Sequence, residues 1–96
     1  MLIYCAHKYG GLEENKIEAE SKIKRLQIND LNNVYISPIH AFGFMYSDID
    51  YDTGMDICFA LLRLCDKLIV LSDISEGVKR EIQFANELSI PVQYYG

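Results

Sequence analysis

The chain has 96 residues, of which 50% are hydrophobic and 24% are charged, so it can bury one hydrophobic core within a single domain. A formal net charge of −5 argues against duplex nucleic-acid binding, which requires a clustered basic surface. No apolar run approaches the roughly 18 residues that span a bilayer. The three cysteines have no CxxC spacing, which is typical of free thiols in a reducing compartment. We therefore expect one cytoplasmic domain over residues 1–96, without a membrane partner.

Short apolar runs alternate with longer amphipathic segments along the chain. The expected strands are 2–6, 34–36, 67–71 and 91–95, and the expected helices are 12–27, 54–64 and 78–88. A helix between consecutive strands implies parallel pairing through right-handed crossovers. The sequence thus predicts a single-domain, three-layer flavodoxin-like or Rossmann-like α/β fold, with three helices and a four-stranded parallel sheet in the order 2-1-3-4.

Two segments between the second and third strands have unusual composition. Residues 39–52 have no clean period and carry several aromatic side chains, so we expect a long functional loop, a candidate lid over a ligand. The helix at 54–65 is apolar almost all the way round, which is typical of a helix covered on two sides. We expect it to form a homo-oligomer interface, the alternative being a helix that is simply well packed within one chain.

Open parallel sheets bind ligands beyond the carboxyl ends of their strands, near the point where strand order reverses. Two segments are expected to meet there: residues 6–11, which contain paired glycines, and residues 73–81, which enter the last helix behind Ser75, a plausible N-cap. Glu81 flanks the apolar stripe of that helix, so partial desolvation would suit it as a nucleophile or base. The alternative is a first-turn glutamate that stabilises its helix.

Other side chains complete the expected site. The histidines are candidates for binding phosphate or protonating a leaving base, and the loop aromatics are candidates for stacking on a nucleobase, with packing roles as the alternative in each case. No metal site is indicated, since the histidines are far apart in sequence and lack neighbouring ligand patterns. The candidate ligand-binding residues are His7, Lys8, Tyr9, Gly10, Gly11, His40, Phe42, Asp73, Ser75 and Gly77.

The pattern Ser75-x-Gly77-x-x-x-Glu81-x-x-x-Ala85, together with the layout of the whole chain, resembles the nucleoside 2-deoxyribosyltransferase-like superfamily, in particular its short bacterial and phage members. The resemblance implies that Glu81 attacks the anomeric carbon of a nucleoside or nucleotide, without a cofactor. It also implies that Ser75 and Gly77 line the phosphate or sugar pocket. The expected activity is cleavage or transfer of an N-glycosidic bond, by an N-glycosidase or a deoxyribosyltransferase.

Two positions depart from the pattern of that superfamily. Cys58 stands where the resemblance leads us to expect a sugar-binding aspartate, eight residues before Asp66, and His7 stands where a serine is expected. These departures keep a second hypothesis open, a phage protein that sequesters an ADP-ribose-derived immune signal without turnover. A third hypothesis makes the domain an accessory subunit that binds a protein through its apolar helix and aromatic loop.

Overall fold

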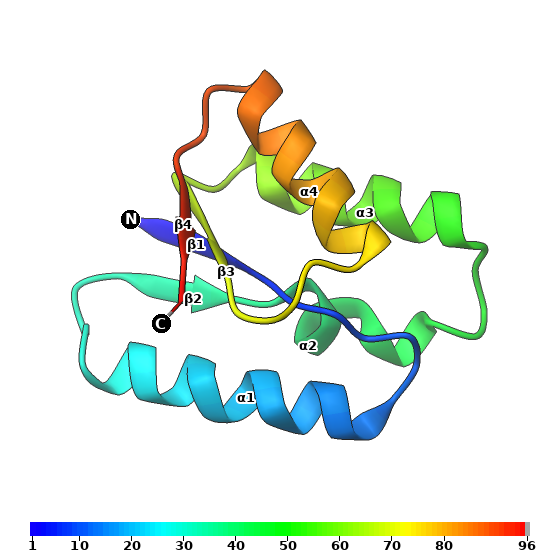
Figure 1. Ribbon diagram of the computed structural model, residues 1–96, viewed down its shortest axis with the longest axis horizontal. Helices are drawn as coiled ribbons and strands as arrows, with labels where there is room; N and C mark the ends of the chain where they lie inside the picture. Colours follow the sequence, from blue (N-terminus) through cyan, green and yellow to red (C-terminus); the bar gives the residue numbers. More distant parts are fainter. Residues whose placement is uncertain (96) are drawn as a thin grey trace.

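A computed structural model describes residues 1–95, which contain four strands and four α-helices. Their order follows the alternation expected from the sequence, with one additional helix and a short 3₁₀ turn (Figure 1). The elements are β1 (Leu2–Ala6), α1 (Glu13–Ile28), β2 (Val34–Ile36), α2 (Pro38–Phe42), η1 (Gly43–Met45), α3 (Tyr51–Arg63), β3 (Lys67–Val70), α4 (Glu76–Glu87) and β4 (Val92–Tyr94).

The four strands form one parallel sheet in the order β2-β1-β3-β4, which confirms the predicted order. In the register, Tyr4 of β1 lies between Ile36 of β2 and Leu68 of β3, and Leu68 pairs in turn with Val92 of β4. The chain therefore reverses its direction of winding between β1 and β3, the place where an open parallel sheet leaves room for a ligand.

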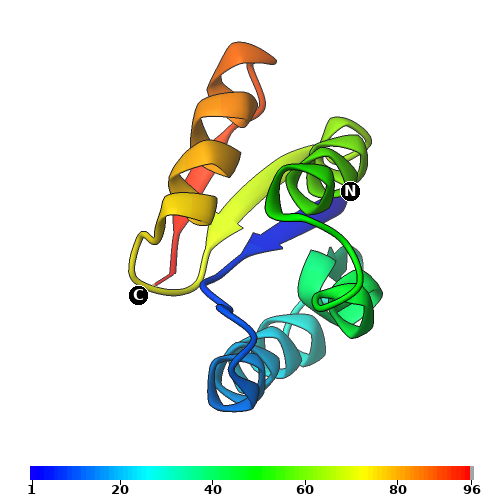
Figure 2. The same cartoon turned by 90° about the vertical axis from the view of Figure 1, so that its right-hand side faces the viewer.

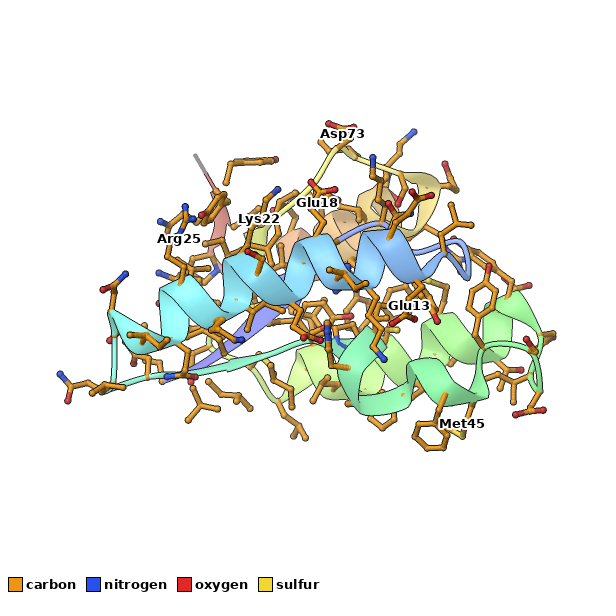
Figure 3. The ribbon with its side chains drawn as sticks, turned by 90° about the horizontal axis from the view of Figure 1, so that it is seen from below. Glu13, Glu18, Lys22, Arg25, Met45 and Asp73 are labelled. Atoms are coloured by element: carbon orange, nitrogen blue, oxygen red, sulfur yellow. The ribbon has the colours of Figure 1, made fainter. Side chains whose placement is uncertain are left out.

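Alternate residues of the strands face two separate cores. Tyr4 and Ala6 of β1 pack with α3 and α4, whereas Ile3 and Cys5 pack with α1. Figures 1 and 2 show the corresponding arrangement, with α3 and α4 on one face of the sheet and α1 on the other. Glu18 and Lys22 form an ion pair at 3.4 Å along one side of α1 (Figure 3), and the Lys22 ammonium also donates a hydrogen bond to the Leu71 carbonyl at 2.6 Å. The period-two pattern of the strands thus puts the Tyr4 side chain under the two helices that border the site.

The segment 39–52 is not the irregular loop that the sequence predicted. Its first half forms α2 and η1, so the prediction of only three helices is wrong. Pro38 occupies the first turn of α2, and the Ser37 hydroxyl accepts a hydrogen bond from the His40 backbone N–H at 3.4 Å. Serine followed by proline is a helix-start signal, because proline needs no intrahelical hydrogen bond at that position. The sequence prediction ended a strand at residue 36 and placed no helix directly after it.

The α3 helix begins three residues earlier than predicted, at Tyr51, because Asp50 is its N-cap. The Asp50 carboxylate accepts a hydrogen bond from the Thr53 N–H at 3.0 Å. Within α3 only Met55 and Leu62 are buried, and Phe59 stacks on Phe84 of α4 with ring centroids 4.5 Å apart. Part of the cover that we expected from a second copy therefore comes from α4, and the homo-oligomer stays a prediction. Within residues 1–95, no helix is both long and apolar enough to cross a membrane.

Candidate functional site

A cavity of about 560 Å³ opens beyond the carboxyl end of β1, between α2 and the first turns of α3 and α4. Figure 2 looks onto the edge of the sheet where these segments converge. The volume lies within the roughly 300–1,000 Å³ range of small-molecule sites. Most of the wall is apolar, and the residues that form it come from segments far apart in the sequence. The cavity is therefore a product of the fold at the edge where the sequence predicted a ligand.

Glu81 is the buried carboxylate of this cavity. It lies on the second turn of α4 and is 5% exposed, although it contributes to the cavity wall. The Tyr4 hydroxyl, fully buried on β1, donates a hydrogen bond to its Oε2. Burial raises the pKa of Glu81 to about 7, and the Tyr4 hydrogen bond opposes that rise. Among the described residues only Tyr4 bonds to this carboxylate, so the second oxygen is left for a ligand.

Cys58 of α3 stands beside this pair. It lines the cavity and is half-buried, and burial together with the charge of Glu81 raises the pKa of its thiol to about 11. Burial and the nearby Glu81 carboxylate likewise raise the pKa of Tyr4 well above its ordinary value. Cys58 and Tyr4 are thus neutral at physiological pH, and Glu81 is the group of the three that ionises near neutrality.

The first turn of α4 forms another part of the wall. The Ser75 hydroxyl caps the helix by accepting a hydrogen bond from the Val78 N–H at 3.3 Å. Ser75 and Gly77 both line the cavity, as the sequence predicted. A Cβ atom on Gly77 would lie 3.3 Å from the Tyr51 hydroxyl, so glycine permits the close approach of α3 and α4 at the cavity mouth.

The loop after β1 supplies the opposite wall. Tyr9 and Gly10 line the cavity, and Tyr9 packs edge-on against Tyr46 with ring centroids 5.1 Å apart. Gly11 lies outside the wall, yet its φ of +75° requires glycine, and a Cβ there would lie 2.9 Å from the Tyr46 ring. The paired glycines therefore turn the chain and also make room for an aromatic side chain. Phe42 lines the same wall from α2.

The two histidines are linked through Ser37 and have different positions. His7 is buried in the cavity wall; its Nε2 lies 2.8 Å from the Ser37 hydroxyl and its Nδ1 lies 3.2 Å from the Lys8 carbonyl. Burial lowers the pKa of His7 to about 4, so the ring is neutral at pH 7. His40 is not among the lining residues; its ring nitrogens contact Ser37 at 3.0 Å and Glu20 at 3.1 Å. With both nitrogens of each ring engaged, the histidines are placed to hold α2 against β1 and α1.

Lys8 and Asp73 form an ion pair at the edge of the site. The Lys8 ammonium lies 3.2 Å from the Asp73 carboxylate, and Lys8 lines the cavity whereas Asp73 does not. Asp73 lies at the periphery of the molecule, on the loop after β3 (Figure 3). Residues 1–95 contain no group of three histidine, cysteine or acidic side chains arranged to hold a metal ion.

A family model described as Domain of unknown function (DUF7768) matches residues 1–95. The chain belongs to this family. No curated protein matches it. The DUF7768 match covers every element of the sheet and every segment of the cavity wall, so fold and cavity together fall within the one family domain.

Several residues that line or support the cavity of this DUF7768 domain were not predicted from the sequence. Tyr4 lies within the predicted strand 2–6 and was given no role in the site. A buried tyrosine hydroxyl needs a hydrogen-bond partner, and Glu81, the candidate nucleophile or base, could have been that partner. Ser37 directly follows the predicted strand 34–36, and its role between the two histidines depends on α2, which was not predicted. The lining residues that were not predicted as site residues include Leu12, Asn15, Pro38, Ile39, Gly43, Ile49, Gly54, Met55, Ile57, Glu76 and Val78.

Proposed function

We propose that the cavity binds a nucleoside, a nucleoside 5′-phosphate or a related ribosyl nucleotide, and that Glu81 cleaves or transfers its N-glycosidic bond. One observation carries the proposal: a buried carboxylate in the cavity wall has one oxygen held by Tyr4 and the other free of protein hydrogen bonds. A nucleophile needs this arrangement, because it must be oriented while one lone pair still faces the substrate.

The reaction proceeds in two displacements. The free oxygen of ionised Glu81 attacks the anomeric carbon, the C–N bond breaks, and the base leaves with the bonding electron pair and takes up a proton from solvent. The product is a glycosyl ester on Glu81. Water then attacks the same carbon to give the free sugar, or a second base attacks it to give a new nucleoside, and the carboxylate is regenerated. Tyr4 keeps Oε2 in place throughout both displacements.

The pKa of Glu81, raised by burial to about 7, fits this role. Near pH 7 a substantial fraction of the carboxylate is ionised, and its basicity exceeds that of an ordinary glutamate, which increases nucleophilicity. The aromatic wall supplies base binding. Tyr9, Phe42 and Tyr46 present ring surfaces to the cavity from two different segments, and such surfaces stack on a nucleobase.

A second candidate is a nucleotide-binding protein that has no turnover, such as a phage protein that sequesters an ADP-ribose-derived signal. Cys58 favours it: where the superfamily resemblance leads us to expect a sugar-binding aspartate, a neutral thiol lies beside Tyr4 and Glu81. A thiol is a weak hydrogen-bond donor and acceptor, so it holds a sugar hydroxyl less firmly than a carboxylate does.

The experiment is to incubate the protein with nucleosides, nucleoside monophosphates and ADP-ribose-derived nucleotides, then analyse free and retained compounds by mass spectrometry. We expect free base or a new nucleoside from the wild type, and a loss of at least about a thousandfold in Glu81→Gln. Glu87→Gln, at the exposed far end of the same helix, is the matched control and should match the wild type. Retention of an intact compound with no product would favour the second candidate, and equal turnover in Glu81→Gln would refute the nucleophile.

A further inference from the structure

The charges around the cavity indicate which ribosyl compounds it accepts. Three carboxylates line it, those of Asp50, Glu76 and Glu81, whereas Lys8 is the only lysine or arginine among the lining residues of the described chain. The Lys8 ammonium is already paired with Asp73 at 3.2 Å. A phosphate dianion entering this cavity would meet more negative than positive charge and would have to compete with Asp73 for the one cation.

The first turn of α4 is where a phosphate would otherwise bind, because helix N-termini offer unpaired N–H groups to anions. Here one of those N–H groups already has a partner within the protein, and an acidic side chain lies in the same turn. Ser75 already accepts the hydrogen bond of Val78 N–H, and Glu76 places a carboxylate in the first turn at the exposed rim of the cavity. The helix dipole stabilises the Glu76 charge, and that charge repels a second anion at the same place.

The nearest arginine does not reverse this balance. The Arg80 guanidinium lies 3.2 Å from Asp52 and stands over the rings of Tyr51 and Phe59, at 5.4 and 5.8 Å from their centroids. It is not part of the cavity wall. Its charge is thus paired with Asp52, in a contact that joins α3 to α4.

We infer that Glu76 is a specificity-determining residue that rejects phosphorylated compounds, so that the ligand of this cavity is an uncharged nucleoside. The inference rests on the proposed function and narrows its substrate class. The base contacts the apolar and aromatic wall, and the sugar reaches Glu81. The 5′-hydroxyl group of the sugar then faces the carboxylates at the rim of the cavity, those of Asp50 and Glu76. That hydroxyl donates a hydrogen bond to a rim carboxylate, which a phosphate lacking the proton cannot do.

The test uses matched pairs, the four 2′-deoxynucleosides and four ribonucleosides against their 5′-monophosphates. The wild type should release base from the preferred nucleoside with a kcat/KM at least about tenfold higher than from its monophosphate. Glu76→Gln should reduce that ratio about tenfold, and Glu76→Lys should reduce it further. Glu87→Gln, which removes the same charge from the far end of α4, should leave the ratio unchanged. The preference of the wild type should weaken at high salt, since Glu76 is exposed.

A monophosphate that reacts as well as its nucleoside, or a Glu87→Gln effect as large as that of Glu76→Gln, would overturn the inference, while base release from either compound would leave the proposed function standing. If no compound reacts, equilibrium dialysis of the same pairs decides. If the protein retains the nucleoside better than the monophosphate, the result supports selection against charged ligands but not the proposed cleavage. If it retains the monophosphate better, the result overturns the inference about Glu76. If neither compound is retained or cleaved, both proposals fall.

Discussion

In the Glu81→Gln variant, the free energy of unfolding relative to the wild type is expected to increase by about 3 kcal/mol as the pH is raised from 4.5 to 7. Folding raises the pKa of Glu81 from an ordinary value of 4.5 to about 7, so the folded state binds more protons across this interval. The contribution of protonated Glu81 to the free energy of unfolding is fully present below pH 4.5 and is lost as the pH rises through 7. Glutamine, which stays neutral, does not incur that loss.

The pH dependence that His7 gives to the free energy of unfolding is expected to have the opposite sign. Its pKa falls from 6.5 to about 4 on folding, chiefly through burial, so the unfolded state binds the extra proton. Its contribution is present above pH 6.5 and is lost as the pH falls through 4. In the wild type, the pH dependences of stability due to Glu81 and to His7 nearly cancel between pH 4.5 and 6.5. Glu81→Gln removes the first of them, and His7→Gln removes the second. The free energy of unfolding of His7→Gln relative to the wild type should therefore decrease as the pH is raised to 7, by an amount similar to the increase in Glu81→Gln. The loss of the His7 contacts adds a cost that does not depend on pH.

Urea unfolding at half-unit intervals from pH 4 to 8 measures both differences, because the background of other titrating groups cancels between variant and wild type. Asp50→Asn, which alters an exposed cap of α3, is a suitable control and should show neither slope above pH 5. Difference curves that stay flat with pH would contradict the burial of these two side chains. Slopes of the same sign in both variants would contradict the assignment of a raised and a lowered pKa.

The Tyr4→Phe variant should show a large loss of turnover that depends on pH. The Tyr4 hydroxyl donates to Glu81 and lowers its pKa against the effect of burial. Since a hydrogen bond to a charged group contributes about 1.5–3 kcal/mol, its removal should move the acidic limb of the rate profile upward by about one to two pH units. Turnover at pH 7 should therefore fall by about five- to fiftyfold and recover in part by pH 9.

Tyr94→Phe provides a matched control, because Tyr94 is a strand tyrosine that is 58% exposed on β4 and does not line the cavity. It should leave the pH profile of turnover unchanged. A Tyr4→Phe enzyme that loses the same fraction of activity at every pH would show that Tyr4 does not act through the ionisation of Glu81. Urea unfolding of both variants separates a loss of fold from a change in the site.

The sequence was sufficient for the sheet and for the edge at which the cavity lies. Strand segments such as 2–6 and 67–71 are short and apolar, and the amphipathic segments between them are too long for hairpins, which leaves few topologies. Ser75, Gly77 and Glu81 have fixed spacing on one helix, so their placement near that edge followed from local structure. The sequence did not predict how deeply Glu81 is buried. Its burial depends on the packing of α4 against β1, which comes from the other end of the chain.

The remaining parts of the site depend on tertiary contacts that no local pattern carries. Tyr4 and Glu81 are 77 residues apart, and Ser37 meets His7 across 30 residues. The α2 helix was missed because Ser37 and Pro38 are compatible with both a strand end and a helix start. Its five residues are also too few to show the helical repeat of apolar side chains. Its position then determined that Phe42 lies on the cavity wall and His40 does not.

The most direct test of the account is to look for the glycosyl ester on Glu81. Wild-type protein is mixed with an excess of the nucleoside that reacts in the screen, quenched in acid within the first turnover, and examined by intact mass and peptide mapping. The account predicts a mass increase equal to the bound sugar on the peptide that contains Glu81, and no such increase in Glu81→Gln. Release of base with no adduct on that peptide, accompanied by undiminished turnover in Glu81→Gln, would contradict it.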